Sequence, residues 1–420
     1  MTGVQTCALP IWKALRERYN AAYKKFDIAV IFLERIIHLL KPGGYGSFII
    51  SNKWLVSDYG EKVRELLLSQ TRIKLIIDIS QLNVFDGTSI YPIIIFFQKI
   101  GDKNAINQEI LIFRPESLHD LYLNSITIRQ ELKNDTSMST KIIRVLQKTF
   151  LNSPHFLIAL PNFNSSSDDL SLFQNLNSNL FFYLNSEQSP YELRKGIHTG
   201  NVKQKIVTQE PPPKNLAYKK LLTSRERVER YSLQWQGLWI HYNPDLIDRK
   251  KGDYGSFREP WIFESSPKIL IKLFGKRLNA AIDLNSYYTN NSIILLVKST
   301  NQKSLNSEIQ NIFDSIEDEF YYLLGILNSQ PVSDFYHLHF SATQVRGGFL
   351  QYYVRNLAQI PMPIPIKGNK PICQEIAAYA KQLATYYSSD SNTRNHNLNT
   401  EIKTIEEQLT LAVEPLYKGI

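Results

Sequence analysis

Three short apolar runs in the first hundred residues constrain the fold more than any other feature of the chain. They read YGSFIIS at 45–51, IKLIIDIS at 73–80 and YPIIIFFQK at 91–99. Within each run the apolar residues are nearly continuous, whereas a strand with one face in water would alternate apolar and polar residues. Continuous runs of this length are typical of strands that are covered on both faces, so we expect helices on either side of a sheet.

The segments around these runs predict helices. Ile28, Phe32 and Ile36 recur at helical spacing before the first run, and the sequence KPGG at 41–44 is expected to end that helix, since glycine readily adopts a left-handed C-cap. A second amphipathic helix is expected at roughly 59–69. The order helix, strand, helix, strand, strand predicts an α/β fold that forms the last part of a doubly wound sheet.

Composition narrows the class of protein. The chain has 420 residues, 43% of them hydrophobic and 21% charged, which is ordinary for a folded protein of two or three domains. Cys7 and Cys373 cannot build a disulfide scaffold or a multi-cysteine zinc site, which favours a reducing compartment such as the cytoplasm. No apolar stretch reaches the roughly 18 residues that a membrane span needs. The net charge of +9 permits nucleic acid as a partner.

The first eleven residues, MTGVQTCALPI, do not have the pattern of a signal peptide. They resemble the translation of a sequencing adaptor, so we expect residues 1–11 to be a non-native leader and the native sequence to begin near Trp12. The alternative is a frayed native terminus, which would equally contribute little to the fold.

The segment 26–99, from FDIAVIFLERIIHLLKPGG to YPIIIFFQK, resembles the second half of the catalytic domain of N6-adenine DNA methyltransferases of the Eco57I/TaqI-like group. The resemblance implies a partial Rossmann-like methyltransferase sheet, consisting of its last strands only, and S-adenosylmethionine as the methyl donor. The family's Asn-Pro-Pro-Tyr loop and its glycine-containing cofactor motif are not found here, and Asn243–Pro244 is interpreted as a turn. We therefore expect a longer native protein, an inactive chain in isolation, and an uncovered sheet edge at 45–51.

One aromatic residue is a candidate for contact with the substrate. Methyltransferases of this kind turn the target adenine out of the duplex and hold it against an aromatic ring. The resemblance places that ring at Phe85, in LNVFDGTSIYPIIIFF. The alternative is that Phe85 packs at the end of the sheet; Tyr91 is expected to be structural. Asp27 and Glu34 are interpreted as a solvated helix face without a chemical role.

Four segments of the second half resemble, in order, the TaqI-like target-recognition domain. They are YELRKGIHTGNVKQKIV (191–207), PKILIKLFGKRLNAAID (267–283), YYLLGILNSQPVSDFYH (321–337) and VRGGFLQYYVRNLAQIPMPIP (345–365). The resemblance implies an α+β, β-rich DNA-recognition domain, and an amphipathic helical tail follows it.

Cations in these segments are candidate DNA contacts. Those near 191–207 surround glycines, which allow close approach of a backbone to phosphate, although a lysine-rich turn is more often a solvated loop. At 267–283 cations alternate with apolar residues, which predicts a pair of strands with a basic outer side. The candidates are Arg194, Lys195, Gly196, Gly200, Lys203, Lys268, Lys272, Lys276, Arg277 and Arg346. Interleaved aromatic residues, such as Trp235 and Tyr254, could stack on DNA but are more often core.

The predicted organisation is a leader at 1–11, the C-terminal part of a methyltransferase domain at 12–105, a connecting region at 106–189, a target-recognition domain at 190–370 and a helical tail at 371–420. The leading hypothesis is a site-specific adenine-N6 DNA methyltransferase of a restriction-modification or related defence system. Double-stranded DNA, and a cognate restriction endonuclease or other defence subunits, are the expected partners. The alternatives are a non-catalytic DNA-binding specificity module that acts with a separate catalytic subunit, and a related RNA methyltransferase. We predict no metal site.

Overall fold

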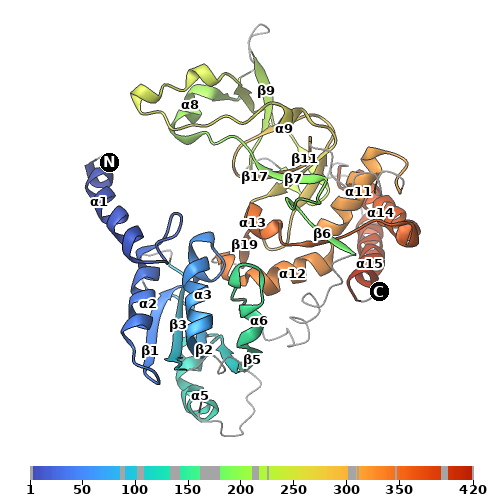
Figure 1. Cartoon of the computed structure of the whole chain (residues 1–420). Helices are drawn as coiled ribbons and strands as arrows, with labels where there is room; N and C mark the ends of the chain where they lie inside the picture. Colours follow the sequence, from blue (N-terminus) through green and yellow to red (C-terminus); the bar gives the residue numbers. More distant parts are fainter. Residues whose placement is uncertain are drawn as a thin grey trace. The chain divides into compact units, whose positions relative to one another are not determined.

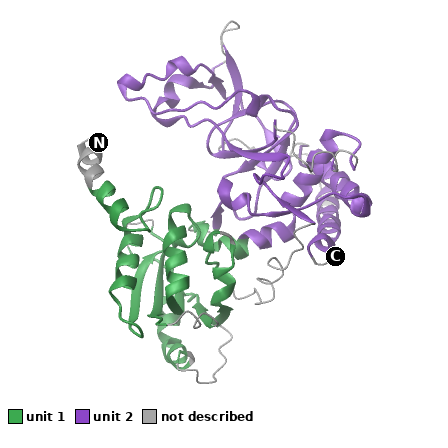
Figure 2. Ribbon diagram, in the orientation of Figure 1, with its two compact units in different colours: residues 1–174, 337–348 green, residues 175–336, 349–420 purple. Residues whose placement is uncertain are grey.

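The computed structural model divides the chain into two compact units (Figures 1 and 2). Unit 1 comprises Met1–Gln174 and His337–Gly348, and unit 2 comprises Asn175–Tyr336 and Phe349–Ile420. The residues that the structure describes are 3–85, 90–101, 108–132, 142–160, 180–210, 217–224, 227–300, 309, 312–345, 348–388 and 396–418.

A five-stranded sheet in the order β1-β3-β2-β4-β5 forms the centre of unit 1. Its strands are β1 (Tyr45–Ser51), β2 (Thr71–Asp78), β3 (Pro92–Lys99), β4 (Glu109–Phe113) and β5 (Ile142–Leu146). Only β2 and β4 run parallel; the other neighbours are antiparallel. The three predicted strands are therefore confirmed as β1, β2 and β3. Two further strands come from the segment that was expected to connect the domains, and β1 lies at the edge, where Tyr45 and Ile49 are exposed.

Helices accompany this sheet (Figure 1), but β1 is not covered on both faces as its apolar run predicted, because Tyr45, Ser47 and Ile49 are exposed. The helices are α1 (Gly3–Arg18), α2 (Ile28–Leu39), α3 (Glu61–Gln70), α4 (Leu118–Leu123), α5 (Ser125–Glu131) and α6 (Gln147–Leu151). Short 3₁₀ turns add η1 (Asn52–Leu55), η2 (Asp58–Gly60), η4 (Pro154–Phe156) and η8 (Ser341–Thr343). The helix predicted at 59–69 corresponds to α3, displaced by about two residues.

Of the two carboxylates at α2, the buried Glu34 contradicts the interpretation as a solvated face, whereas Asp27 is exposed as expected. Asp27 is the N-cap of the helix, and its side chain accepts a hydrogen bond from the Ala29 amide. Glu34 is only 1% exposed and accepts hydrogen bonds from the amides of Asn20 and Ala21. Both groups satisfy backbone donors that would otherwise lack a partner, so their role is structural.

The apolar face expected to be buried on α2 is instead largely exposed. Ile28 and Phe32 are 47% and 57% exposed, whereas Val30, Leu33 and Ile37 are buried. Since α2 is apolar around most of its circumference, its sequence predicts the helix but does not select the face that packs inward.

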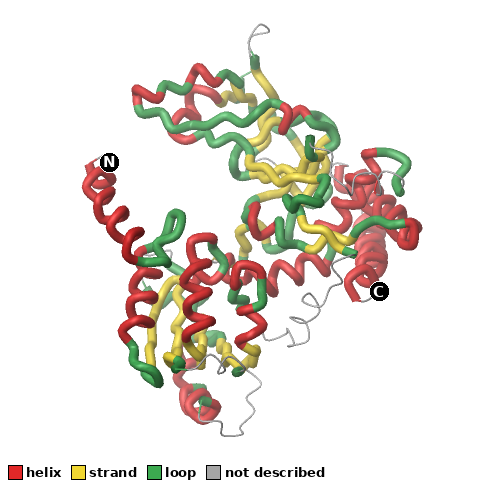
Figure 3. Tube along the Cα trace, viewed as in Figure 1, coloured by secondary structure: helices red, strands yellow, loops and turns green. Residues whose placement is uncertain are grey.

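Unit 2 is built on two four-stranded sheets (Figure 3). The first has the order β15-β13-β17-β7, with β7 (Tyr191–Lys195), β13 (Lys268–Lys272), β15 (Ala280–Asp283) and β17 (Ile293–Lys298). The second has the order β16-β9-β12-β8, with β8 (Val207–Thr208), β9 (Tyr218–Leu222), β12 (Trp239–His241) and β16 (Tyr288–Thr289). Shorter strands are β6 (Phe181–Tyr183), β10 (Arg227–Glu229), β11 (Ser232–Gln234), β14 (Phe274–Gly275), β19 (Phe349–Gln351) and β20 (Pro361–Pro363). A core that includes Leu270, Leu295 and Tyr288 draws on both four-stranded sheets.

Helices complete unit 2. They are α8 (Lys203–Ile206), α9 (Trp261–Glu264), α11 (Ile316–Asn328), α13 (Val354–Leu357), α14 (Lys370–Ser388) and α15 (His396–Lys418), and α12 (Gln330–Phe340) carries the chain into unit 1. The predicted helical tail is confirmed as α14 and α15. Gly325 allows α11 to approach α14, because a Cβ atom there would lie 2.8 Å from a side-chain carbon of Ile376. No helix in the described ranges is long and apolar enough to cross a bilayer.

Candidate nucleic-acid interface

In unit 1 the candidate stacking residue lies in the loop between β2 and β3. Phe85 is 43% exposed, whereas the nearby Tyr91 is buried and its carbonyl accepts a hydrogen bond from the Asn52 amide. The start of the loop is fixed because the buried Asp78 pairs with Arg114 at 2.7 Å and accepts a hydrogen bond from the Ser80 amide. The ring of Phe85 thus presents surface to solvent next to an anchored strand end, while Tyr91 packs as expected.

The other candidates that the structure describes belong to unit 2, where most of the cations have accessible positions. The strand register places Lys272 opposite Ile293, and Lys195 opposite Ile294, so these two lysines lie at the same end of the sheet on either side of β17. The exposed cations are Arg194, Lys195, Lys203, Lys276 and Arg277, and Lys272 is half-buried. Arg346 lies outside the described residues.

Lys268 corrects the prediction. Its side chain is completely buried and forms an ion pair with Asp283 at 2.7 Å. Its Nζ also donates hydrogen bonds to the carbonyls of Phe263 and Ser265. Because both faces of β13 are covered, the alternation of lysine and apolar residues does not produce a basic outer side. Lys268 therefore does not form part of a DNA-contacting surface.

The two glycines also serve a different purpose from the predicted one. A Cβ atom at the buried Gly196 would lie 2.3 Å from the Asn290 carbonyl oxygen, so glycine is needed there for contact with the protein's own backbone. Gly200 has a φ of +52°, and a Cβ atom there would lie 2.8 Å from the ring of Tyr254. At both positions the requirement for glycine arises from the protein's own atoms.

Two of the basic side chains near these glycines have acidic neighbours. Arg194 pairs with Glu192 and lies 6.0 Å from the ring of Trp261. Lys205 forms an ion pair of 2.9 Å with Asp253, and hydrogen bonds from Lys205 and from the Asp248 amide lower the pKa of the Asp253 carboxyl. A carboxylate neighbour partly neutralises a cation, so these two positions are less able to attract phosphate than their exposure suggests.

Most of the interleaved aromatic residues pack against the core, as expected. Tyr288 is 1% exposed and stacks on Phe263 with 4.5 Å between ring centroids. Trp235 contacts Trp239 edge to face at 4.9 Å. Tyr254 is the exception, with 57% of its surface exposed.

Two basic groups in unit 2 were not singled out from the sequence. On β9, Lys220 places its Nζ 4.8 Å from the ring centroid of Trp235, and Lys219 lies 5.5 Å from that of Tyr288. The exposed run Arg249–Lys251 forms the turn η7, which Asp248 caps by accepting hydrogen bonds from two of its amides. The run of three consecutive cations could have been recognised in the sequence. The two lysines of β9 could not, because the aromatic rings that they contact are brought close only by strand pairing.

Comparisons with known proteins found two family models that match different parts of the chain. The family model described as Eco57I restriction-modification methylase matches residues 8–85, and the TaqI-like C-terminal specificity domain matches residues 219–362. These matches, together with similar type II methyltransferases, confirm the predicted resemblance to methyltransferases of the Eco57I/TaqI-like type.

Relatives of known activity match different shares of the chain. The type II restriction enzyme and methyltransferase RM.Eco57I of Escherichia coli is 30% identical over 141 residues, which are 33% of this chain and 14% of that protein. The type II methyltransferase M.BanIII of Aneurinibacillus aneurinilyticus is 21% identical over 467 residues, with 93% of this chain and 72% of that protein covered. The chain thus spans only a small part of RM.Eco57I.

A solved structure supports the fold. The type IIL restriction-modification enzyme MmeI, determined in complex with DNA, gives a TM-score of 0.57 at 12% identity, over 96% of this chain and 51% of that one. At this identity the similarity shows the mixed α/β fold alone.

Proposed function

We propose that this chain forms the DNA-recognising part of a site-specific adenine-N6 DNA methyltransferase of a restriction-modification or related defence system. The observation that carries the proposal is the order of two matches on one chain, an Eco57I-type methylase segment at 8–85 followed by a TaqI-like specificity domain at 219–362. The names of the relatives, and the DNA bound to the MmeI neighbour, support double-stranded DNA as the partner. A cognate restriction endonuclease or another defence subunit is a further expected partner.

In this proposal unit 2 holds the duplex through its accessible cations. Lys195, Lys272, Lys276 and Arg277 supply charge from β7, β13 and the segment after β13. Each cation that neutralises a phosphate releases counterions from DNA, which provides affinity without reading the sequence. Sequence recognition requires additional contacts with base edges.

Phe85 is the proposed stacking partner of the target adenine. An exposed ring in a loop can receive a base that has left the duplex, and an anchored strand end keeps its position. The partly exposed surface of Phe85 supports this role over simple packing.

The methyl donor of such an enzyme is S-adenosylmethionine, and Gly46 and Gly60 of unit 1 leave no cradle for it. A Cβ atom at Gly46 would lie 2.6 Å from the ring of Phe97, and one at Gly60 would lie 1.9 Å from the Trp54 carbonyl oxygen. Both positions are filled by the protein itself, so these residues do not fit the cofactor. We propose that methyl transfer depends on residues outside this sequence and that the chain by itself binds DNA without modifying it.

Two measurements test the proposal. Fluorescence anisotropy with a labelled duplex over a salt series should show binding whose affinity falls as salt rises, whereas a chain that does not bind duplex DNA would refute DNA recognition. Transfer of label from S-adenosylmethionine should be undetectable for this chain and detectable when the upstream genomic coding sequence is included. Turnover by the chain alone would overturn the division of roles, and turnover that required a separate subunit would favour the non-catalytic specificity module.

A further inference from the structure

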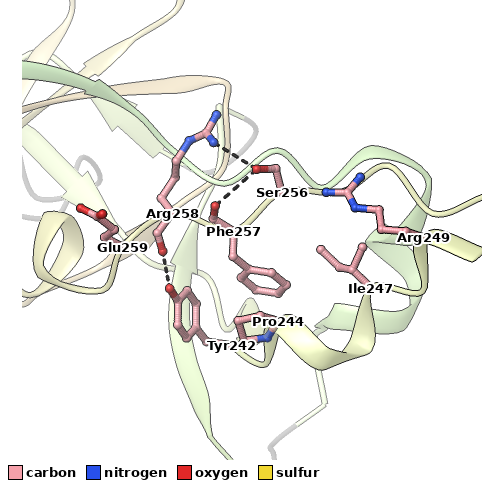
Figure 4. Close-up of a pocket in the computed structure, with 8 residues that line it drawn as sticks. All are labelled: Tyr242, Pro244, Ile247, Arg249, Ser256, Phe257, Arg258 and Glu259. Carbon is pink, nitrogen blue, oxygen red and sulfur yellow. Dashed lines mark hydrogen bonds between the residues drawn. The ribbon is translucent and has the colours of Figure 1, made fainter.

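Unit 2 contains an open hollow that neither the family resemblance nor the predicted contacts account for. It has a volume of about 480 Å³ and lies between the turn η6 (Pro244–Leu246) and the segment Ser256–Glu259 (Figure 4). This volume falls in the range of about 300–1,000 Å³ that is typical of ligand sites.

One side of the hollow is apolar and firmly held. Tyr242 and Phe257 meet edge to face with 5.0 Å between ring centroids, and Pro244 and Ile247 extend this wall. The hydroxyl of Tyr242 donates a hydrogen bond to the Arg258 carbonyl, and burial raises the pKa of this hydroxyl, so it stays protonated. The wall therefore offers a fixed aromatic surface to a planar or ring-shaped group.

The rim of the hollow carries two guanidinium groups. Arg258 is half-buried and donates one hydrogen bond, from Nη1 to the Ser256 hydroxyl at 3.1 Å. Arg249 is exposed and donates to the carbonyls of Asp253 and Gly255. Among the described residues, neither guanidinium is paired with a carboxylate. A guanidinium has five N–H donors, so both retain donors for an anion.

A single acidic side chain lines the same hollow. The carboxylate of Glu259 accepts a hydrogen bond from Trp261 Nε1 at 2.6 Å. Two cations and one anion give the lining of the hollow a net positive charge. In the adjoining segment Lys250 and Lys251 are offset by Asp245 and by Asp248, which pairs with Lys251 at 3.6 Å. The combination of an aromatic wall and a cationic rim matches a nucleotide, which joins a ring to a phosphate.

We propose that this hollow seats one nucleotide of the bound DNA, with its phosphate at Arg258 and Arg249 and its sugar or base against Tyr242 and Phe257. The inference rests on the proposed function, since it takes DNA as the source of the nucleotide. It adds a discrete subsite to an interface that otherwise consists of dispersed cations.

Two substitutions in the hollow should act in opposite directions. Arg258→Gln removes a phosphate partner, whereas Glu259→Gln removes a repelling charge and keeps an acceptor for Trp261. Lys403→Gln and Glu407→Gln on α15 make the same changes in net charge at exposed positions away from the hollow and serve as matched controls. Thermal melts followed by circular dichroism establish that each variant is folded.

The readout is the affinity for a labelled duplex over a salt series, together with competition by deoxyadenosine 5′-monophosphate. For Arg258→Gln we expect the slope of log affinity against log salt to decrease by about 0.9, which is about an eightfold loss near 0.1 M salt, and for Glu259→Gln we expect tighter binding. The matched controls should bind as the parent does. If Arg258→Gln fails to fold, the tightening by Glu259→Gln decides the question.

The outcomes separate the two proposals. Variants that bind the duplex exactly like their controls would overturn the nucleotide subsite and leave DNA recognition intact. A parent chain that does not bind the duplex but binds the monophosphate, with loss in Arg258→Gln, would refute the proposed function and show that the hollow takes a free nucleotide. Binding of neither probe would overturn both.

Discussion

The Nζ atom of Lys268 lies 2.7 Å from a carboxylate oxygen of Asp283, and neither side chain is exposed to solvent. The two residues face each other across the antiparallel pair β13–β15. Asp283 also accepts hydrogen bonds from the amides of Asn285 and Tyr287, so the ion pair fixes the turn that follows β15. Burial lowers the pKa of Lys268, while the charge of Asp283 opposes this shift.

Breaking this pair should destabilise unit 2. Lys268→Met leaves the Asp283 carboxylate buried without its partner, and we expect a loss of about 3–5 kcal/mol in the free energy of unfolding. Urea denaturation measures the loss. The double variant Lys268→Met/Asp283→Asn should recover part of it, because the amide carries no charge; a single variant as stable as the parent would contradict the inferred role.

Substitution of the accessible lysines Lys272 and Lys276 should weaken DNA binding and leave the stability of the fold nearly unchanged. Lys272→Gln and Lys276→Gln are expected to leave stability within about 0.5 kcal/mol, since neither side chain is fully buried. If each contacts one phosphate, each should reduce the salt slope of duplex binding by about 0.9. Anisotropy titrations give the slope, Lys403→Gln is the control, and an unchanged slope would remove that lysine from the interface.

Arg64 should be essential to unit 1. Its guanidinium is buried and donates hydrogen bonds to the carbonyls of Trp54, Ser57, His155 and Phe156, and thereby connects α3 to η4. Arg64→Met leaves these buried acceptors without that donor, so we expect a loss of about 3–5 kcal/mol. Thermal unfolding measures it. Arg35→Met, at an exposed position of α2, should have little effect, and equal effects of the two would count against the network.

Substitution of Phe85 should reduce methyl transfer more than it reduces the stability of the fold. Phe85→Ala is expected to lower kcat/KM for methyl transfer by about 5- to 150-fold in a protein that includes the upstream residues, because stacking contributes about 1–3 kcal/mol per base. Phe85→Tyr retains the ring and should stay near the parent. An alanine variant with normal turnover, or one that unfolds, would favour the packing interpretation.

Alkaline pH should unfold unit 2. Burial raises the pKa of Tyr191, Tyr322 and Tyr417 well above the ordinary value near 10. Above pH 10 the unfolded chain has lost these protons and the folded chain has kept them, so stability falls as pH rises, by roughly 1.4 kcal/mol per pH unit and tyrosine. Tyrosinate absorbance of this buried set should therefore rise together with the loss of circular dichroism. Ionisation that clearly preceded unfolding would contradict the prediction.

The sequence was most informative where one local pattern fixes one structure. Continuous apolar runs predicted β1, β2 and β3, and helical spacing predicted α3 and the tail. Patterns that depend on a distant neighbour were less informative. The segment KILIK was expected to have a basic outer side, yet the first four residues of β13 are buried and only Lys272 is partly exposed. The edges of β13 pair with β15 and β17, and the burial of its side chains depends on residues distant in the sequence.

The sequence by itself indicated β1, β2, β3, α3 and the helical tail, the resemblance to methyltransferases of the Eco57I/TaqI-like type, and the positions of the cations along the chain. Only the tertiary structure decided which cations remain accessible. Lys268 and Lys276 are chemically identical and eight positions apart, but one faces Asp283 in the core and the other is exposed. Burial of a charge depends on residues brought close by folding, and the same is true of the hollow at Arg258, which combines a turn and a later segment that no local pattern connects.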